Sequence, residues 1–461
     1  MFSWLKPSVL FNRRSAATDP EPPVPAGPRI VPRGEHGVSR ANISENALKV
    51  LYRLTKADHE AYLVGGGVRD LLLGHEPKDF DVATSATPEE VKELFRNSRL
   101  IGRRFRLAHV FFGGNKEIIE VATFRAGHDD GDGEGEMENG MIVRDNVYGT
   151  LEDDAWRRDF TVNALYYDIR DFSVVDHTGG VEDLRAGRLR IIGDPYKRFR
   201  EDPVRMLRAV RFAAKLGFRI DSESEAAIYE LGHLLQEVVP ARLFDEILKL
   251  FMAGYGVETF ELLRHYRLFG YLFPETDERL AHEEGGFPLT FIARALENTD
   301  NRVGEGKPVT PAFLFAALMW EPLRHEAARL RSEGANPLQA IQDAAGEVVA
   351  RQNRHVAFPK RFSLQSREIW ELQERFTRRN GKRPYRLLDH PRFRAGYDFL
   401  VLRAGCEEGL EELAAWWGKF QDASNEERRT MTAATPGSGG KKRPRRRRRG
   451  GNRKKQDNPE G

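Results

Sequence analysis

Two aspartates separated by one residue are the first feature of the chain that could carry chemistry. Asp79 and Asp81 lie in the segment Lys78-Asp79-Phe80-Asp81-Val82. In a β-strand, residues i and i+2 face the same side, so both carboxylates would project together while Phe80 and Val82 pack on the other side. Mg²⁺ (or Mn²⁺) is held by a few carboxylates together with substrate phosphates. The pair therefore predicts a divalent-metal site, with a solvated strand face as the alternative.

Two further acids are candidates for completing such a site. Glu120 lies between two β-branched residues in a predicted strand, and Asp159 follows Arg157 and Arg158. Arginines and an acid at the start of an apolar helix, which we expect after Asp159, could contact a triphosphate and a ribose. Glu120 could equally lie on a solvated strand face, and Asp159 could be only a helix N-cap. The sequence leaves open which acid completes the site.

A glycine-rich turn precedes the aspartate pair, in Leu63-Val64-Gly65-Gly66-Gly67-Val68-Arg69-Asp70. Glycines have no Cβ, so Gly65 and Gly66 would let backbone N–H groups approach a phosphate. The N-terminus of the following helix and the guanidinium of Arg69 would add positive charge. A plain tight turn between a strand and a helix is the alternative interpretation.

An arginine-rich helix is predicted after residue 202. Asp202 is the expected N-cap and Pro203 the first helical residue. Arg205, Arg208 and Arg211 recur at every third position and would form a ridge on one helix face. Arginine forks on such a ridge could hold phosphate or contact the acceptor edge of a base, although basic helix faces are usually just solvated.

The elements that would position these motifs alternate between strands and helices up to about residue 195 and are helical afterwards. The fold class predicted from this pattern is α+β, with a small mixed β-sheet followed by an all-α region. The predicted strands are 61–64, 80–83, 107–112, 117–124, 172–176 and 189–192, and the predicted helices include 44–56, 68–73, 87–97, 204–216, 223–237, 242–252, 260–264 and 311–317. Residues 127–140, almost all Gly, Asp and Glu, are predicted to be a solvated loop.

Composition divides the chain of 461 residues into five predicted parts. These are a disordered leader (1–40), an α/β head (41–195), a helical neck (196–260), a helical body (261–420) and a disordered basic tail (421–461). The single cysteine, Cys406, rules out an intrachain disulfide and a cysteine-rich zinc site, and it favours the cytoplasm. No run of about 18 apolar residues predicts a membrane span, so we expect no obligate membrane partner.

The net charge of +3 conceals an asymmetry between the tail and the rest of the chain. Residues 441–461 contain eleven Lys and Arg against two acids, a net charge of +9, which leaves −6 for the remainder. Such a tail predicts a polyanionic partner, with a merely solubilising extension as the alternative.

Taken in this order, the four motifs resemble the class II branch of the nucleotidyltransferases, which contains the tRNA CCA-adding enzymes and the bacterial poly(A) polymerases. The resemblance runs from about Ile43 to Phe218 and, motif by motif less strongly, to about Phe420. Features that look like the polymerases within this branch are Leu-Ile-Gly-Arg-Arg-Phe-Arg-Leu-Ala-His-Val (100–110), the extended N-terminus, residues 311–317, Gly381-Lys382-Arg383 and the basic tail. The acidic insert at 129–139 departs from the family pattern.

The resemblance implies template-independent transfer of AMP from ATP to RNA 3′ ends by two metal ions about 3.5–4 Å apart. It implies that Asp79 and Asp81 hold metal and that Asp159 is a further active-site acid, Glu120 being the other candidate. The implied nucleotide-binding residues are Gly65, Gly66, Arg69, Arg158, Asp202, Arg205 and Arg208, of which Asp202 and Arg205 would select the base.

The implied partners are ATP, the 3′ ends of mRNA, regulatory RNA and tRNA precursors, and proteins of RNA decay. The body and the tail would supply RNA binding. A CCA-adding enzyme, which would also incorporate CTP, is the nearest alternative function. A non-catalytic RNA-binding protein with an inactive head is the alternative from a different class.

Overall fold

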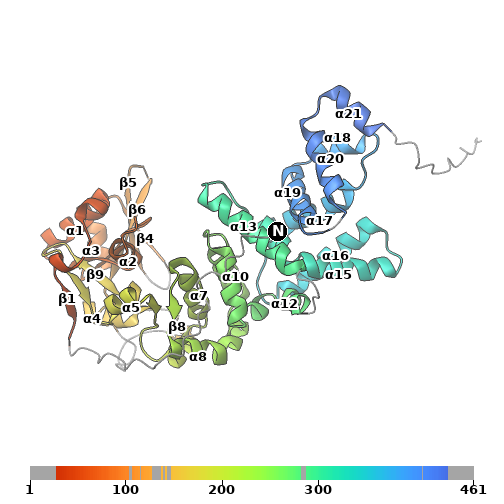
Figure 1. Ribbon diagram of the computed structural model, residues 1–461. Helices are drawn as coiled ribbons and strands as arrows, with labels where there is room; N and C mark the ends of the chain where they lie inside the picture. The colour runs from red at the N-terminus through yellow and green to blue at the C-terminus, as the bar shows by residue number, and fades with distance from the viewer. Residues whose placement is uncertain are drawn as a thin grey trace, which may run out of the picture. The chain divides into compact units, whose positions relative to one another are not determined.

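The computed structural model describes residues 27–102, 106–114, 116–126, 137–138, 141–142, 147–281, 287–407 and 409–433. The chain divides into two compact units, which are treated separately below (Figure 1). The first comprises Met1–His282, Leu296–Val309 and Ala350–Phe358, and the second comprises Glu283–Ala295, Thr310–Val349 and Pro359–Gly461. The predicted leader up to residue 26 and the basic tail from residue 434 lie outside the described residues.

An eight-stranded sheet forms the centre of the first unit, with strand order β1-β10-β9-β2-β3-β6-β5-β4. Only the β3–β6 pair is parallel among these neighbours. The strands are β1 (Arg29–Val31), β2 (Ala61–Val64), β3 (Asp81–Thr84), β4 (Ser98–Ile101), β5 (Leu107–Phe112), β6 (Glu117–Thr123), β9 (Leu165–Asp168) and β10 (Val174–Asp176). Shorter pairs are β7 (Met137–Glu138) with β8 (Met141–Ile142) and β11 (Arg188–Leu189) with β12 (Arg219–Ile220).

Helices cover both faces of this sheet. On one face, α4 (Leu151–Arg157) contributes Ala155 to a buried cluster with Val64, Ala83 and Tyr166. The alternate strand residues Leu63 and Val82 are also fully buried, and α1 (Glu45–Lys56) contacts β2 and β3. The other helices of this region are α2 (Gly66–Leu72), α3 (Pro88–Leu94) and α5 (Gly180–Ala186).

Local sequence signals account for the ends of several helices. The Ser44 side chain caps α1 by accepting from the backbone N–H groups of Asn46 and Ala47. Thr87 and Glu90 form a reciprocal capping box at the start of α3, with Pro88 as the first helical residue. Both helices begin where the sequence predicted them.

The helical part of the first unit begins at α6. Its elements are α6 (Pro195–Glu201), α7 (Val204–Leu216), α8 (Ser222–Leu231), the 3-10 helix η5 (Gly232–Glu237), α9 (Pro240–Phe251), α10 (Gly256–His265), α11 (Phe269–Leu272) and α12 (Pro274–Ala281). Met206, Leu207 and Val210 of α7 are fully buried, as their spacing predicted, and α7 packs on α9 and α10. The predicted helix 223–237 is two elements, because the chain changes to 3-10 geometry at Gly232.

The second unit is helical in the part that the structure describes. It contains α14 (Pro311–Leu318), α15 (Trp320–Ser332), α17 (Lys360–Phe376), α18 (Arg383–Leu388), α19 (Phe393–Ala404), α20 (Glu411–Asp422) and α21 (Asn425–Thr432), while α13 (Phe287–Gly304) and α16 (Pro337–Gln352) belong partly to each unit. Leu372, Phe376, Leu400, Trp417 and Phe420 form its aromatic-rich core. Within the described ranges, no helix combines the length and the hydropathy that a membrane span requires.

The α+β fold class is confirmed, but several element predictions are wrong. Residues 29–31, predicted as part of a disordered leader, form β1 because they pair with β10. The apolar helix expected after Asp159 is a 3-10 turn (Thr161–Asn163) followed by β9. Residues 425–432, predicted as disordered tail, form α21, with Ser424 and Glu427 in a capping box. Strand β4 was not predicted.

Candidate active site

Five residues form a row across five neighbouring strands. The strand register pairs Tyr166 of β9 with Val64 of β2, and Val64 with Asp81 of β3. Asp81 pairs with Glu120 of β6, and Glu120 pairs with His109 of β5. Directly paired residues point to the same face of a sheet, with Cβ atoms about 5 Å apart. Strand pairing therefore places the Asp81 and Glu120 side chains next to each other.

The two aspartates of the predicted metal site differ in burial. Asp79 is exposed just before β3 begins, Asp81 is partly buried, and Phe80 and Val82 between and after them are buried. Burial above all, together with the charges of Glu120 and Asp79, raises the pKa of Asp81 to about 6. Burial alternates along residues 79–82 as the predicted orientation requires, although the strand itself begins only at Asp81.

Glu120 joins these aspartates through the sheet register. Its side chain is about half exposed, and the Nε2 atom of His109 lies 3.0 Å from its Oε1 atom. The position opposite Asp81 could not be derived from the sequence, because it depends on the parallel pairing of β3 with β6. Of the two acids that the sequence left open, Glu120 is the one adjacent to Asp81.

A divalent cation suits this acid cluster. Among the described residues, no group of three or more His, Cys, Asp or Glu side chains is arranged to enclose a metal ion, so a closed protein cage is not formed there. Burial and the charges of Glu120 and Asp79 nevertheless disfavour the ionised form of Asp81, and a bound cation would offset both effects. Mg²⁺ needs only one or two carboxylates when substrate phosphates and water complete its shell.

Arg158 brings positive charge to the same face. It is the C-cap of α4, and its charge lowers the pKa of Asp81 against the effect of burial. A Cβ atom added to Gly65 would lie 3.5 Å from the Nη1 atom of Arg158. Gly65 has φ +75° and ψ −136°, a conformation that glycine adopts without strain. The glycine turn, Arg158 and Asp81 are therefore neighbours.

The other glycines of the turn belong to helix α2. Gly66 is its first residue, so the three glycines do not form one loop between strand and helix as predicted. A Cβ on Gly67 would lie 3.4 Å from the carbonyl oxygen of Asp79 and 3.6 Å from the ring of Phe80. Gly67 therefore lets α2 pack closely on the segment that carries the first aspartate.

Arg69, predicted to supply a charged fork to a phosphate, has a buried side chain. Its side chain is 2% exposed. Its Nε and Nη2 atoms donate to Oδ1 of Asp70 at 2.8 and 2.7 Å, and its Nη1 atom donates to Oδ1 of Asn163 at 2.5 Å. The guanidinium also lies 5.5 Å from the ring centre of Phe212 in α7. Arg69 thus connects α2 with the 3-10 turn and with α7.

Asp159 is bound by the arginine helix. The Arg208 Nε atom donates to its Oδ2 atom at 2.8 Å, while Asn163 and the backbone N–H of Phe160 donate to its Oδ1 atom at 3.3 and 2.8 Å. Burial alone would raise the pKa of Asp159, but the ion pair with Arg208 and these hydrogen bonds outweigh it and hold the pKa below its usual value. Asp159 and Arg208 therefore engage each other.

Asp202 and Arg205 lie where α6 meets α7. Arg205 donates from Nη1 to the carbonyl oxygen of Arg198 at 2.8 Å and to Oε2 of Glu201 at 2.9 Å. Asp202 accepts from the Val204 backbone N–H, and structurally it ends α6 rather than serving as the N-cap of α7. Its Oδ2 atom also accepts from Nη2 of Arg242 at 2.6 Å. No local sequence pattern indicates Arg242, because this contact joins α9 to a residue 40 positions earlier.

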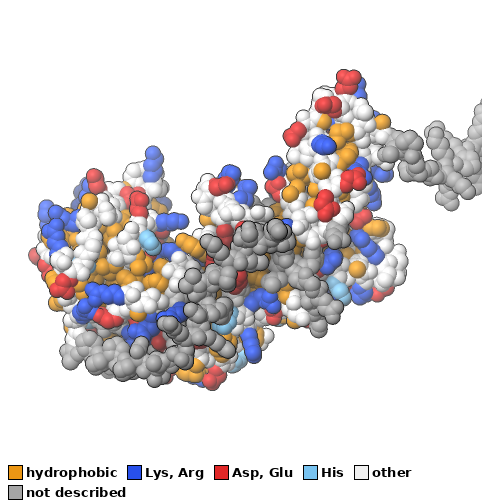
Figure 2. Space-filling view, viewed as in Figure 1, with side chains coloured by type: hydrophobic (Ala, Val, Ile, Leu, Met, Phe, Trp, Pro, Cys, Tyr) orange, Lys and Arg blue, Asp and Glu red, His pale blue; other side chains and the backbone are white. Residues whose placement is uncertain are grey.

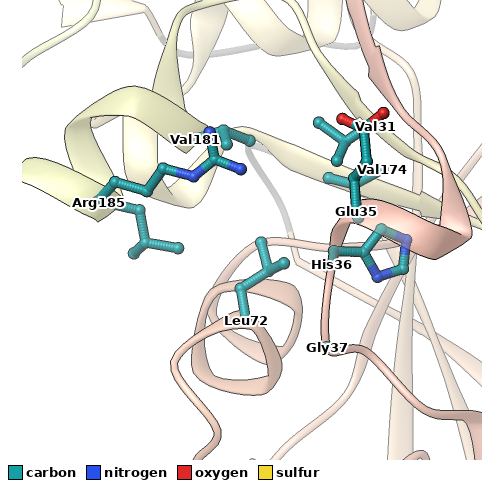
Figure 3. Close-up of a pocket in the computed structure, with 9 residues that line it drawn as sticks. Val31, Glu35, His36, Gly37, Leu72, Val174, Val181 and Arg185 are labelled. Atoms are coloured by element: carbon teal, nitrogen blue, oxygen red, sulfur yellow. The ribbon is translucent and has the colours of Figure 1, made fainter.

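A separate pocket of about 170 Å³ lies elsewhere in the first unit (Figure 3). Val181 and Arg185 of α5 lie on one side of it, across from Glu35 and His36, and Leu72 of α2 also lines it (Figure 3). None of the predicted metal- or nucleotide-binding residues lines this pocket. The candidate active site is therefore the group of residues around Asp81 and not this cavity.

Nucleotidyltransferase is the class that this arrangement defines, because acids able to hold metal lie beside a glycine turn and an arginine in a sheet that leads into helices. Three family models match the chain. They describe the poly A polymerase head domain (residues 61–190), a probable RNA and SrmB-binding site of polymerase A (217–280) and the arginine-rich C-terminus of polymerase A (333–451).

Individual relatives agree with these models. Poly(A) polymerase I of Escherichia coli O6:H1 is 55% identical over 401 residues, which cover 85% of each chain. The CCA-adding enzyme of Lactobacillus helveticus is 41% identical over 216 residues, covering 47% of this chain and 52% of that protein. The crystal structure of the Bacillus stearothermophilus CCA-adding enzyme with CTP has a TM-score of 0.53 and 26% identity, covering 81% of this chain and 82% of that one. The chain belongs to the bacterial poly(A) polymerase family of nucleotidyltransferases, as its motifs predicted.

Proposed function

We propose that the protein transfers AMP from ATP to the 3′-hydroxyl ends of RNA without a template and releases pyrophosphate. The observation that carries the proposal is the pairing of Asp81 with Glu120 beside Arg158, in a chain that matches poly(A) polymerase I over 85% of its length. A non-catalytic RNA-binding protein would not need two acids paired across neighbouring strands with a third acid just before one of them, because like charges side by side are unfavourable.

In this proposal, the acids Asp79, Asp81 and Glu120 hold the metal ions, with His109 orienting the Glu120 carboxylate through their 3.0 Å contact. When bound, these ions would lower the pKa of the attacking hydroxyl and neutralise charge on the departing pyrophosphate. Arg158, above the Gly65 turn, would bind the triphosphate and hold it in line. The protein thus contributes mainly positioning and electrostatics.

Base recognition would fall to Asp202 and Arg205. Both side chains are partly exposed and both have hydrogen-bonding partners that a base edge could replace, Arg242 for Asp202 and Glu201 for Arg205. Arg208, which the resemblance also assigns to the nucleotide, is engaged by Asp159. Its contribution would be to hold the start of α7 against the loop that carries Asp159 and Arg158.

RNA would bind to the second unit. A shallow groove of about 550 Å³ lies between α18 and α21 and is lined by Gly381, Lys382, Tyr385, Arg386, Asp389, Arg429, Thr432 and Ala433. Three of these side chains are basic and one is acidic, so the groove is suited to a phosphate backbone. Basic and acidic side chains of the described residues are interspersed on the face that Figure 2 shows. The predicted basic tail follows directly in the sequence and would extend this surface.

The cellular part of the proposal concerns the RNA substrates, the protein partners and the compartment. The substrates would be the 3′ ends of mRNA, regulatory RNA and tRNA precursors, because phosphate contacts from the groove and the tail carry no sequence specificity. Proteins of RNA decay would be further partners, and the cytoplasm would be the compartment.

CCA addition is the alternative function, since a CCA-adding enzyme shares 41% identity with half of this chain. The test is to incubate the purified protein with each labelled nucleoside triphosphate and either a generic RNA oligomer or a tRNA lacking its terminus. Long extension with ATP alone on both RNAs supports the proposal. Addition of C, C and A that stops on tRNA and fails on the oligomer would replace it with CCA addition.

A further inference from the structure

We propose that Asp154 and Tyr166 are positioning residues that fix the Arg158 guanidinium so that it meets the triphosphate of bound ATP. The inference rests on the proposed function of Arg158 and extends it to two residues that neither the motifs nor the comparisons single out. It begins from three polar side chains that contact one another, one of which, Tyr166, belongs to the register row that also contains Asp81 and Glu120 (the acid row).

The three side chains form a closed hydrogen-bonded triangle. Arg158 donates from Nε to the Tyr166 hydroxyl at 2.9 Å and to Oδ2 of Asp154 at 3.2 Å, and from Nη2 to the same Oδ2 atom at 3.0 Å. The Tyr166 hydroxyl in turn donates to Oδ2 of Asp154 at 2.8 Å. Each member therefore contacts the other two, and one edge of the guanidinium is held at two nitrogen atoms.

Burial makes this triangle rigid. Asp154 is 5% exposed and Tyr166 is 0% exposed, whereas the Arg158 side chain is 24% exposed. The Tyr166 ring packs in the cluster between α4 and the sheet and makes an edge-to-face contact with Tyr62 at 6.2 Å. Burial above all raises the pKa of Tyr166, so its hydroxyl stays protonated and can donate to Asp154. Asp154 and Tyr166 therefore hold Arg158 from within the core, and Arg158 is the only one of the three that reaches the surface.

The free edge of the guanidinium faces the candidate site. Among the described residues, Nη1 has no hydrogen-bond partner, and it is the atom nearest to the position of a Cβ on Gly65. The register row places Tyr166 two strands from Asp81, with Val64 between them, and the charge of Arg158 acts on Asp81. One edge of the guanidinium is already held in the free protein, and the other edge is open. Donating to phosphate oxygens therefore costs little further side-chain entropy when ATP binds.

The test measures ATP affinity and AMP transfer in Tyr166→Phe and Asp154→Asn, each alone and combined with Arg158→Ala. Loss of one such hydrogen bond corresponds to about tenfold in an equilibrium. We therefore expect Tyr166→Phe to raise the Kd and the KM for ATP about tenfold with little change in RNA affinity. In the Arg158→Ala background the same substitution should change either value less than twofold, because there is no guanidinium left to position.

Tyr62→Phe is the matched control. Tyr62 belongs to the same cluster and is 4% exposed, and its hydroxyl accepts a hydrogen bond from Arg170 at 2.8 Å, away from the acid row. The Tyr62→Phe variant should lose about as much folding stability as Tyr166→Phe and should keep the wild-type affinity for ATP. A merely structural role of Tyr166 would give equal effects with and without Arg158, or no effect on ATP affinity at all, and either outcome would overturn the proposal.

Two readouts separate this inference from the proposed function. ATP binding is measured by calorimetry without RNA, so a protein that binds ATP through Arg158 but transfers no AMP would contradict the function and leave the positioning role intact. Normal AMP transfer, together with an ATP affinity that Tyr166→Phe does not change, would support the proposed function and contradict the positioning role. If Asp154→Asn does not fold, Tyr166→Phe alone decides, because it removes a hydroxyl and keeps the ring.

Discussion

The Asp159 carboxylate and the Arg208 guanidinium form an ion pair that joins the loop before β9 to helix α7. The pair continues through Asn163, which donates to Asp159 and accepts from Arg69 of α2. This chain of four side chains therefore links the strand region of the first unit to its helical region. It explains why Asp159 and Arg69, which the motifs assign to nucleotide chemistry, have their polar atoms engaged by neighbouring protein groups.

Asp159→Asn should lower the free energy of unfolding of the first unit by more than it raises the activation free energy of AMP transfer. The substitution removes a charged partner of Arg208, which costs about 2 kcal/mol for a partly buried pair. The folded-state pKa of Asp159 is lowered, so its contribution is present above the unfolded pKa of about 4 and is lost as the pH falls below it. The stability difference between wild type and variant, measured by urea unfolding, should shrink between pH 5 and pH 3. A constant difference would contradict the ion pair.

Asp81→Asn and Glu120→Gln should reduce AMP transfer without lowering the melting temperature. Loss of a metal-holding carboxylate removes several kcal/mol of transition-state stabilisation, which is about a thousandfold in kcat for Asp81. We expect a smaller loss and a higher Mg²⁺ requirement for Glu120, whose side chain is about half exposed. RNA affinity, measured by filter binding, should stay constant. The control is Glu89→Gln, an exposed acid of α3 paired with Arg106. A rate for Asp81→Asn close to wild type would exclude the metal assignment.

Gly65→Ala should weaken ATP binding, while Gly74→Ala should not. Both glycines have φ +75°, so both substitutions bring backbone strain of about 1–3 kcal/mol. Only at Gly65 would the added Cβ contact the Arg158 guanidinium, since nothing lies within 4 Å of a Cβ on Gly74. At 3.5 Å this contact is an ordinary van der Waals distance, so comparing KM for ATP in the two variants separates backbone strain from the effect of a methyl group beside Arg158. Equal KM values would show that the turn does not contact the nucleotide.

Charge reversal of the groove between α18 and α21 should weaken RNA binding and its dependence on salt. Lys382, Arg386 and Arg429 replaced together by Glu would remove up to three phosphate contacts, reducing the slope of log K against log salt by about 2. ATP affinity should not change. Arg379, Arg392 and Arg394, which already pair with acids, supply a charge-matched control triple. An unchanged salt slope would place RNA elsewhere on the chain.

The sequence predicted the fold class and most strands because their signals are local. Ser44 and Thr87 cap helices by contacts within three residues, Pro88 starts the helix after Thr87, and the alternation around Asp81 needs only one strand. The wrong predictions concern segments whose secondary structure depends on pairing with strands distant in the sequence. Residues 29–31 become β1 only through β10, and the segment after Asn163 becomes β9 only between β10 and β2.

The sequence predicted which residues belong to the candidate site, but not which of them contact one another. Motif spacing identified Asp79, Asp81 and Arg158, and left Glu120 and Asp159 as equal candidates. No local signal states that β6 lies parallel to β3, or that Arg208 reaches Asp159 across 49 positions. Asp154 and Tyr166 resemble ordinary helix and strand residues until the structure shows that both contact Arg158.

The parallel pairing of β3 with β6 has a consequence for how the enzyme acquires its activity. Its two strands are separated by α3, β4 and β5, so the Asp81–Glu120 pair depends on a contact that forms slowly compared with a hairpin. Chains refolding from denaturant should regain most of their helical signal before they regain AMP transfer. A newly made chain should likewise be inactive until its sheet has closed around these two acids.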